Sequence, residues 1–136
     1  MPFRYRSITP ILAGLSLAAS TGPASLAAET GPESARIVLA NFSFTPSDLH
    51  LNAGKPVVLH FVNEGSGGHN FVAPEFFAAA SMDDATRGRL RKKGAVELAK
   101  GESVDVTLTP RSGNYEAKCT HFLHAGFGMK GTITVR

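Results

Sequence analysis

"CTHFLHAGFGM", Cys119 to Met129, is the most informative segment of this chain. It contains the single cysteine of the sequence, two of its five histidines and one of its three methionines. Thiolate, imidazole and thioether groups are all ligands for transition metals. Their density in one short segment near the C-terminus therefore predicts a metal site.

The run that precedes this loop predicts how its cysteine is oriented. In "NYEAKC", which ends at Cys119, apolar and charged residues alternate. Because side chains alternate between the two faces of a strand, the Cys119 sulfur is expected to face the core. His124 and Met129 follow at intervals of five residues, so a loop that folds back can bring three ligand groups together. We expect the fourth ligand to be His69, which follows a glycine-rich turn and begins a short strand.

The mixture of ligand types indicates which metal is bound. Two histidines, one cysteine and a weakly held methionine are the ligand set of an electron-transfer copper site. Zinc fits less well, because structural zinc sites use cysteine, histidine and carboxylate ligands but not methionine. A lone cysteine cannot form an internal disulfide. In an oxidising compartment it is buried and inert, paired with another chain, or held by a metal.

Three segments resemble the cupredoxins, the azurin and plastocyanin superfamily of small type 1 blue-copper proteins. The pattern Cys119-x4-His124-x4-Met129, followed by "KGTITV", resembles the copper loop of that family. "GGHNF" (67–71) resembles the segment that carries its first histidine, and "FSFTPSDLHLNAGKPVVLHFVN" (42–63) is similar to its opening strands. The resemblance implies an all-β, antiparallel Greek-key sandwich or barrel that binds one type 1 copper ion.

The same resemblance assigns the ligands. His69, Cys119 and His124 would be the strong ligands, and Met129 would be the weak axial ligand. Gly68 would bring a backbone carbonyl group near the metal.

The resemblance also predicts the surroundings of the ligands. Asn70 would tie the two ligand segments together, through Thr120. One departure from the family is that Phe122-Leu123 replaces the Pro-Gly that many relatives have before the loop histidine. Another is that His121 is an additional histidine, which could compete as a ligand or hydrogen-bond nearby.

Short runs rich in β-branched and aromatic residues, separated by turn signals, predict the strands of this fold. These runs are 35–44, 49–51, 57–62, 69–72, 103–109, 114–119 and 131–136. His50 and His60 lie on two of them and are expected to be surface or hydrogen-bonded histidines with no role in metal binding.

Between residues 74 and 94 the strand-like pattern gives way to a helical one. This predicts a helical insertion that begins at Pro74 and ends at Gly94. Ser81 and Asp84 have the spacing of a capping box for a second helical piece. The basic residues between 87 and 93 are read as a solvated helix end, which is favourable to the helix dipole, in preference to a docking patch.

The N-terminus predicts export. Arg4 and Arg6 precede a short apolar run, residues 8–20, and small residues lead to a cleavage site after Ala27, or after Ala28. The run is too short for a membrane-spanning helix. We therefore predict a signal peptide (1–27), a linker (28–34) and one domain (35–136).

The mature chain would be a periplasmic monomer with a formal charge of +1, without the basic field of a nucleic-acid-binding protein. The favoured function is a copper protein, not an enzyme, that passes single electrons between larger redox proteins in transient contacts. Small or apolar residues at 125–128 would form a rim through which His124 reaches the surface.

The alternative is a copper carrier or tolerance protein that delivers the metal to another protein. A copper oxidase would need a second copper site with further histidines, and the sequence shows no spare cluster.

Overall fold

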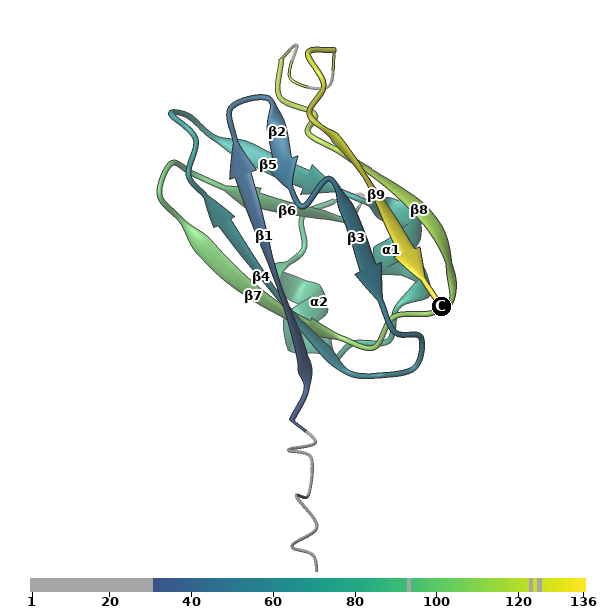
Figure 1. Cartoon of the computed structure of the whole chain (residues 1–136). Helices are drawn as coiled ribbons and strands as arrows, with labels where there is room; N and C mark the ends of the chain where they lie inside the picture. The colour runs from purple at the N-terminus through teal and green to yellow at the C-terminus, as the bar shows by residue number, and fades with distance from the viewer. Residues whose placement is uncertain (1–30, 93, 123, 125) are drawn as a thin grey trace, which may run out of the picture.

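The fold of this protein is given by a computed structural model that describes residues 31–92, 94–122, 124 and 126–136. Two β-sheets pack face to face, and two short helices lie in the connection between strands β5 and β6 (Figure 1). The predicted β-sandwich with a helical insertion is therefore confirmed. The predicted signal peptide lies outside the described residues, and the division into linker and domain stays a prediction.

The first sheet has the strand order β2-β1-β4-β7. Its strands are β1 (Glu33–Ala40), β2 (Ser43–Thr45), β4 (Val57–Asn63) and β7 (Ser103–Leu108). Strands β1 and β4 pair in parallel, and the other two pairs are antiparallel.

The second sheet has the order β3-β9-β8-β5-β6. Its strands are β3 (Asp48–Leu51), β5 (His69–Val72), β6 (Ala95–Leu98), β8 (Gly113–Lys118) and β9 (Lys130–Val135). Strand β3 pairs in parallel with β9. The sheets are therefore mixed and not wholly antiparallel, because the chain crosses from one sheet to the other between β2 and β3 and between β3 and β4.

The single strand predicted at 35–44 is wrong, since the chain turns back at Asn41 and Phe42. Strand β2 folds onto β1 with Ala40 opposite Ser43. Phe42 has a φ of 64°, in the left-handed region that bulky residues seldom adopt. The segment carries no glycine or proline to mark this turn, which is why the sequence pattern did not reveal it. The turn places two side chains at the end of the sandwich that holds the copper loop.

The helical insertion consists of two short helices, α1 (Pro74–Ala79) and α2 (Asp84–Arg89), so helical structure ends before the predicted stop at Gly94. Pro74 begins α1 as expected. The cap of α2 is Asp83, whose carboxylate accepts the backbone N–H of Thr86 at 2.6 Å, and this hydrogen bond holds the pKa of Asp83 below its usual value. The predicted cap at Ser81 is wrong, because Ser81 forms a β-bridge with Thr109.

Strand β6 (Ala95–Leu98) was not expected, because it is only four residues long and follows directly on the predicted helical insertion. It pairs antiparallel with β5, so that Leu98 lies opposite His69 and Glu97 lies opposite Asn70. This edge strand therefore flanks the segment that carries the first predicted ligand.

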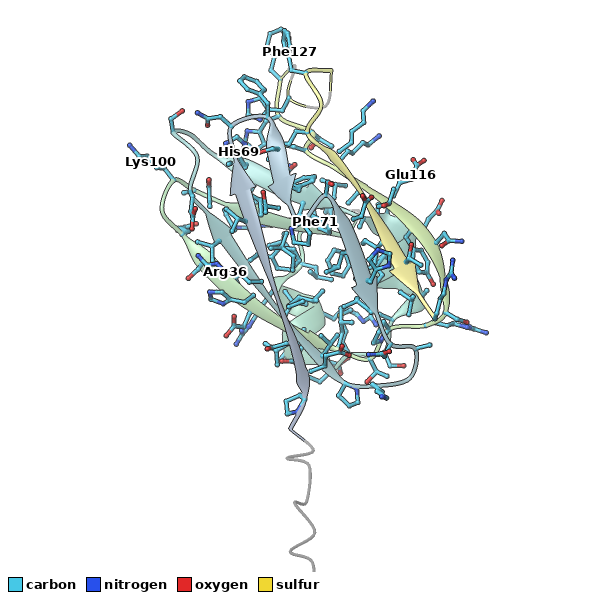
Figure 2. The ribbon with its side chains drawn as sticks, in the orientation of Figure 1. Arg36, His69, Phe71, Lys100, Glu116 and Phe127 are labelled. Carbon is cyan, nitrogen blue, oxygen red and sulfur yellow. The ribbon has the colours of Figure 1, made fainter. Side chains whose placement is uncertain are left out.

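The core lies between the two sheets and reaches up to the predicted sulfur ligands. Phe71 contacts both Phe44 and Phe61 with ring centroids 5.1 Å apart. Cys119 and Met129 belong to the same buried cluster, and neither is accessible to solvent. The inward orientation predicted for Cys119 is confirmed. Figure 2 shows His69 and Phe71 on the same short strand, with Phe127 projecting from the loop above them.

Neither α1 nor α2 has the length and apolar character that crossing a bilayer requires, within the part of the chain that the structure describes.

Candidate metal centre

Three predicted ligands converge at one end of the sandwich. The ligand atoms of His69, Cys119 and His124 all lie within 4.8 Å of one another. Nδ1 of His124 is 3.1 Å from Nδ1 of His69 and 3.4 Å from Sγ of Cys119. His69 thus meets two residues that follow it by 50 and 55 positions, and together they present two imidazole nitrogens and a sulfur to one small space.

Backbone hydrogen bonds close the loop that carries three of the four predicted ligands. The N–H of Cys119 donates to the carbonyl oxygen of Met129 at 3.1 Å, so the two ends of the loop lie side by side. The N–H of Met129 donates to the carbonyl oxygen of His124 at 3.0 Å. Since Cys119 and Met129 are both fully buried, the sulfur groups rest on the core while His124 lies nearer the surface.

His69 is held from its far side by the turn between β1 and β2. Its side chain is 1% exposed, and its Nε2 lies 3.4 Å from Oδ1 of Asn41. The same oxygen accepts the backbone N–H of Ser66 at 2.9 Å. A proton on Nε2 would face Asn41 and leave the Nδ1 lone pair directed toward Cys119 and His124, as a metal ligand requires.

The electrostatic surroundings favour the neutral form of His69. Burial lowers the pKa of its imidazole, and the neighbouring His124 and His121 lower it further. A metal binds the neutral imidazole, so these surroundings keep His69 in the form that coordinates.

Asn63 fixes the glycine-rich turn in front of His69. The residue is 1% exposed, and the two hydrogens of its amide nitrogen are shared among the carbonyl oxygens of Gly67, Leu98 and Ala99, at 2.9, 3.0 and 3.0 Å. Its amide oxygen accepts the N–H of Gly65 at 2.9 Å. Sequence reasoning missed this residue, because an asparagine before a run of glycine and serine is expected in any turn.

We expect Gly65→Ala to weaken copper binding. A Cβ atom at this position would overlap Nε2 of His69 and lie 2.9 Å from Oδ1 of Asn41, so the buried imidazole would have to move. A competition titration with a copper chelator measures the change. Gly67→Ala is the matched control, because no atom lies within 4 Å of the Cβ it would add. Equal copper affinities in the two variants would contradict this role of Gly65.

Asn70 and Thr120 join the two ligand segments through two hydrogen bonds. The Asn70 amide nitrogen donates to Oγ1 of Thr120 at 2.9 Å, and the backbone N–H of Thr120 donates to the Asn70 amide oxygen at 2.8 Å. Since Asn70 follows His69 and Thr120 follows Cys119, this tie fixes the spacing between an imidazole and the thiol.

His121 lies outside the group of converging ligand atoms. Its Nε2 is 2.6 Å from Oε1 of Glu97, on β6. Gly68 lies beside it, and a Cβ on Gly68 would be 3.3 Å from Cε1 of His121. The predicted role of the Gly68 carbonyl group near the metal stays a prediction.

The other two histidines also lie outside the site. His60 forms a hydrogen-bonded pair with Asp105 on the neighbouring strand β7, and His50 is exposed on β3. Both positions agree with the expectation of surface or hydrogen-bonded histidines.

Exposed aromatic side chains lie in the loop that carries His124 and in the neighbouring β1–β2 turn. Phe42 packs edge-on against the His124 ring with centroids 5.2 Å apart, and against Phe127 at 5.6 Å. Phe42, Phe122 and Phe127 are 46%, 87% and 66% exposed. Sequence reasoning placed Phe127 in this rim but did not include Phe122, and it missed Phe42, which comes from the unexpected turn.

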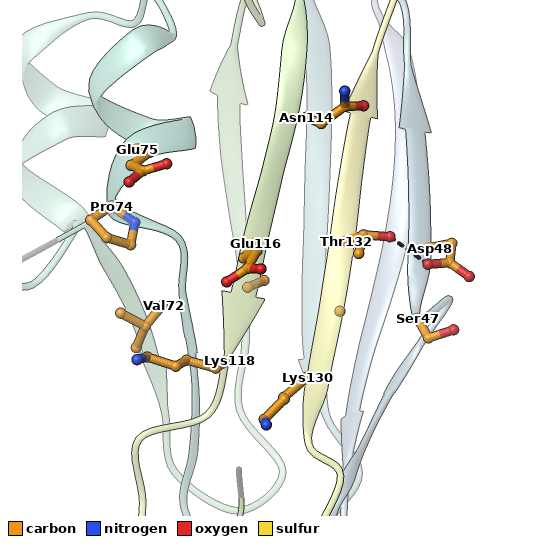
Figure 3. Close-up of a pocket in the computed structure, with 12 residues that line it drawn as sticks. Ser47, Asp48, Val72, Pro74, Glu75, Asn114, Glu116, Lys118, Lys130 and Thr132 are labelled. Atoms are coloured by element: carbon orange, nitrogen blue, oxygen red, sulfur yellow. Dashed lines mark hydrogen bonds between the residues drawn. The ribbon is translucent and has the colours of Figure 1, made fainter.

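A groove of about 920 Å³ lies elsewhere, on the solvent-facing side of the second sheet (Figure 3). Charged side chains from β8, β9 and α1 line much of it, among them Glu75, Glu116, Lys118 and Lys130. None of the predicted metal ligands borders it.

The donor atoms at the site fit copper. Two imidazole nitrogens and a thiol converge, and the thioether residue Met129 is buried at the base of the same loop. Within the described residues, no carboxylate belongs to the converging group. A set of soft sulfur and borderline nitrogen donors suits copper better than magnesium or calcium, which prefer oxygen.

Comparison with known families identifies a match over most of the chain. The model of the "Copper binding proteins, plastocyanin/azurin family" matches residues 34–136. No curated protein matches the sequence.

Solved structures show where the fold occurs. An auracyanin from the photosynthetic bacterium Roseiflexus castenholzii is 21% identical with a TM-score of 0.57, over 78% of this chain and 99% of that one. Auracyanin A, a "blue" copper protein from the green thermophilic photosynthetic bacterium Chloroflexus aurantiacus, is 24% identical with a TM-score of 0.54, over 78% and 100%. A multicopper oxidase is 18% identical with a TM-score of 0.57, over 76% of this chain and 41% of its own. At these identities the likeness concerns the fold.

Proposed function

Since the chain belongs to the plastocyanin/azurin family of copper binding proteins, we propose that it holds one type 1 copper ion and carries single electrons between larger redox proteins. The observation that supports this most directly is the convergence of His69, Cys119 and His124, with Met129 buried at the end of the same loop. Copper bound there would supply a one-electron couple between Cu(I) and Cu(II).

The packing around the ligands suits fast electron transfer. The Cys119 side chain is buried in the core, and His69 is held between Asn41 and the turn that Asn63 fixes. Ligands that cannot relax toward the geometry preferred by either oxidation state keep the structural change between the states small. Such a site is suited to exchanging electrons and less suited to releasing its metal.

Partner proteins are proposed to dock on the aromatic rim around His124. This aromatic rim consists of Phe42, Phe122 and Phe127, which are exposed. Phe42 packs against the His124 ring, and Phe122 and Phe127 belong to the same loop as His124. Aromatic contact residues are enriched at interfaces, and redox contacts are small and short-lived. The rim would bring the redox centre of a partner close to His124.

We further propose that the protein acts outside the cytoplasm, as a periplasmic monomer without enzymatic activity. The first 27 residues support the exported location. They contain basic residues, then a short apolar run and then small residues, in the order typical of a signal peptide. An exported location also suits a chain whose lone cysteine would be protected by a metal.

We expect Met129→Leu to keep copper and its visible colour but to raise the reduction potential. A thioether donates some electron density to Cu(II), so its removal makes the oxidised state less favourable, while leucine fills a similar volume in the core. Cyclic voltammetry of the wild type and the variant measures the change. Met82→Leu is the control, since Met82 packs against the core in the connection between the helices.

The same variant separates electron transfer from copper delivery. In a protein that delivers Cu(I), the thioether would be a principal soft ligand. A large loss of Cu(I) affinity in Met129→Leu, together with the lack of a reversible couple in the wild type, would contradict the electron carrier and favour the copper carrier.

A further inference from the structure

Three imidazole rings lie close together at the metal centre, although only two of them converge on it. The ring centroids of His69 and His124 are 4.7 Å apart, and those of His121 are 5.8 Å from His124 and 6.4 Å from His69. Imidazole binds both Cu(I) and Cu(II), so a third ring at this distance is a potential competing ligand. Some feature of the structure must keep it away from the metal.

Glu97 is directed toward His121 and forms a hydrogen bond with Nε2 of its ring, which resists rotation of the ring toward the metal centre. Oε1 of Glu97 lies 2.6 Å from Nε2 of His121, a short hydrogen bond in which the acceptor is a carboxylate oxygen. Both side chains are only about one-third exposed, at 38% and 35%, which limits competition from water.

The Glu97 carboxylate is itself held in position. Its second oxygen, Oε2, accepts the Asn70 amide nitrogen at 3.0 Å. Asn70 lies directly opposite Glu97 in the β5–β6 pair and is bound to Thr120 in turn. One carboxylate therefore connects the edge strand, the residue after His69 and the loop after Cys119.

The neighbouring Gly68 leaves space for this arrangement. The Cε1 edge of the His121 ring would be 3.3 Å from a Cβ atom at Gly68, closer than side chains usually approach. A side chain at Gly68 would press the ring away from the position that Glu97 selects.

We propose that Glu97 is a positioning residue that holds His121 out of the metal's coordination and so leaves His124 as the loop histidine that binds copper. This inference rests on the proposed copper site. Glu97 acts on the metal only through the placement of His121. Removal of the carboxylate frees His121 to add a further nitrogen ligand, which would compete with the weak Met129 thioether.

The test compares the visible spectra of four copper-loaded proteins: the wild type, Glu97→Ala, His121→Ala and the double variant. In Glu97→Ala, we expect the main thiolate-to-copper band to lose intensity and shift to shorter wavelength, because an added imidazole weakens the copper–thiolate interaction. In His121→Ala and in the double variant, the band is expected at its wild-type position. Glu116→Ala, which removes an exposed carboxylate on β8, is the matched control and should leave the band unchanged.

The double variant distinguishes two ways in which Glu97→Ala could change the copper band. Glu97 also contacts Asn70, so its removal could disturb the site through the tie to Thr120. A shift that persists in the double variant would overturn the inference, as would an unchanged band in Glu97→Ala. Glu97→Asp, which keeps the charge but withdraws it by one methylene group, should give a smaller shift in the same direction and guards against misfolding of the alanine variant.

The copper-free protein gives a second readout. In the wild type, the imidazole nitrogen chemical shifts of neutral His121 should show the proton on Nε2, facing Glu97, and Glu97→Ala should change them. Unchanged shifts would overturn the role of Glu97 whatever the metal does. A wild-type protein without the thiolate band would instead contradict the proposed copper function, so the two failures are distinguishable.

Discussion

Cys119→Ser is expected to abolish the intense visible band that the wild-type protein should develop with Cu(II). The band arises from charge transfer between a thiolate and copper, and Cys119 is the single cysteine of the sequence. A serine hydroxyl remains protonated near neutral pH and is a harder, weaker ligand, so the histidines alone would hold any remaining copper. A visible titration of both proteins with Cu(II) measures the loss.

The buried position of Cys119 requires a control for folding. The copper-free variant should keep the far-ultraviolet circular dichroism of the wild type, since serine is nearly the same size as cysteine. A band that survives in folded Cys119→Ser, or a wild-type protein that binds copper without colour, would contradict a type 1 site.

Asn63→Ala should destabilise the fold by about 3 kcal/mol, because three carbonyl groups and one N–H group lose a buried partner at once. For a domain of this size, that corresponds to a fall in Tm of about 10 °C or more. Thermal unfolding of the copper-free protein, followed by circular dichroism, measures the effect on the fold alone. The copper affinity should fall as well, since the turn before His69 loses its anchor.

Asn52→Ala is the matched control for this prediction. Asn52 is exposed, and its amide nitrogen donates only to the Glu33 carboxylate at the surface. Its replacement should change the free energy of unfolding by a few tenths of a kcal/mol at most. Similar Tm values for the two variants would show that the Asn63 hydrogen bonds do not anchor the turn.

The features that the sequence predicted well are those encoded in short patterns. Alternation placed Cys119 toward the core, and runs of β-branched residues located most of the strands of both sheets. The spacing of Cys119, His124 and Met129 indicated a ligand loop that the structure closes by backbone hydrogen bonds. In each case the structural feature is determined by residues that lie close together in the sequence.

The features that were missed depend on contacts between distant segments. The turn at Asn41 and Phe42 contains no glycine or proline, and strand β6 is short and is held by its pairing with β5. The importance of Asn63 and Glu97 arises from partners 35 and 24 positions away, on β6 and in the copper loop. No window of sequence around either residue contains those partners.

The turn between β1 and β2 affects the order in which the parts of the protein come together during folding. Asn41 contacts the segment of His69, and Phe42 contacts His124 in the C-terminal loop. Contacts between such distant parts of a chain form late during folding, because closing a long loop costs entropy before any contact is gained. The colour of the bound metal would therefore mark the last stage of maturation, after the first hairpin and the final loop have met.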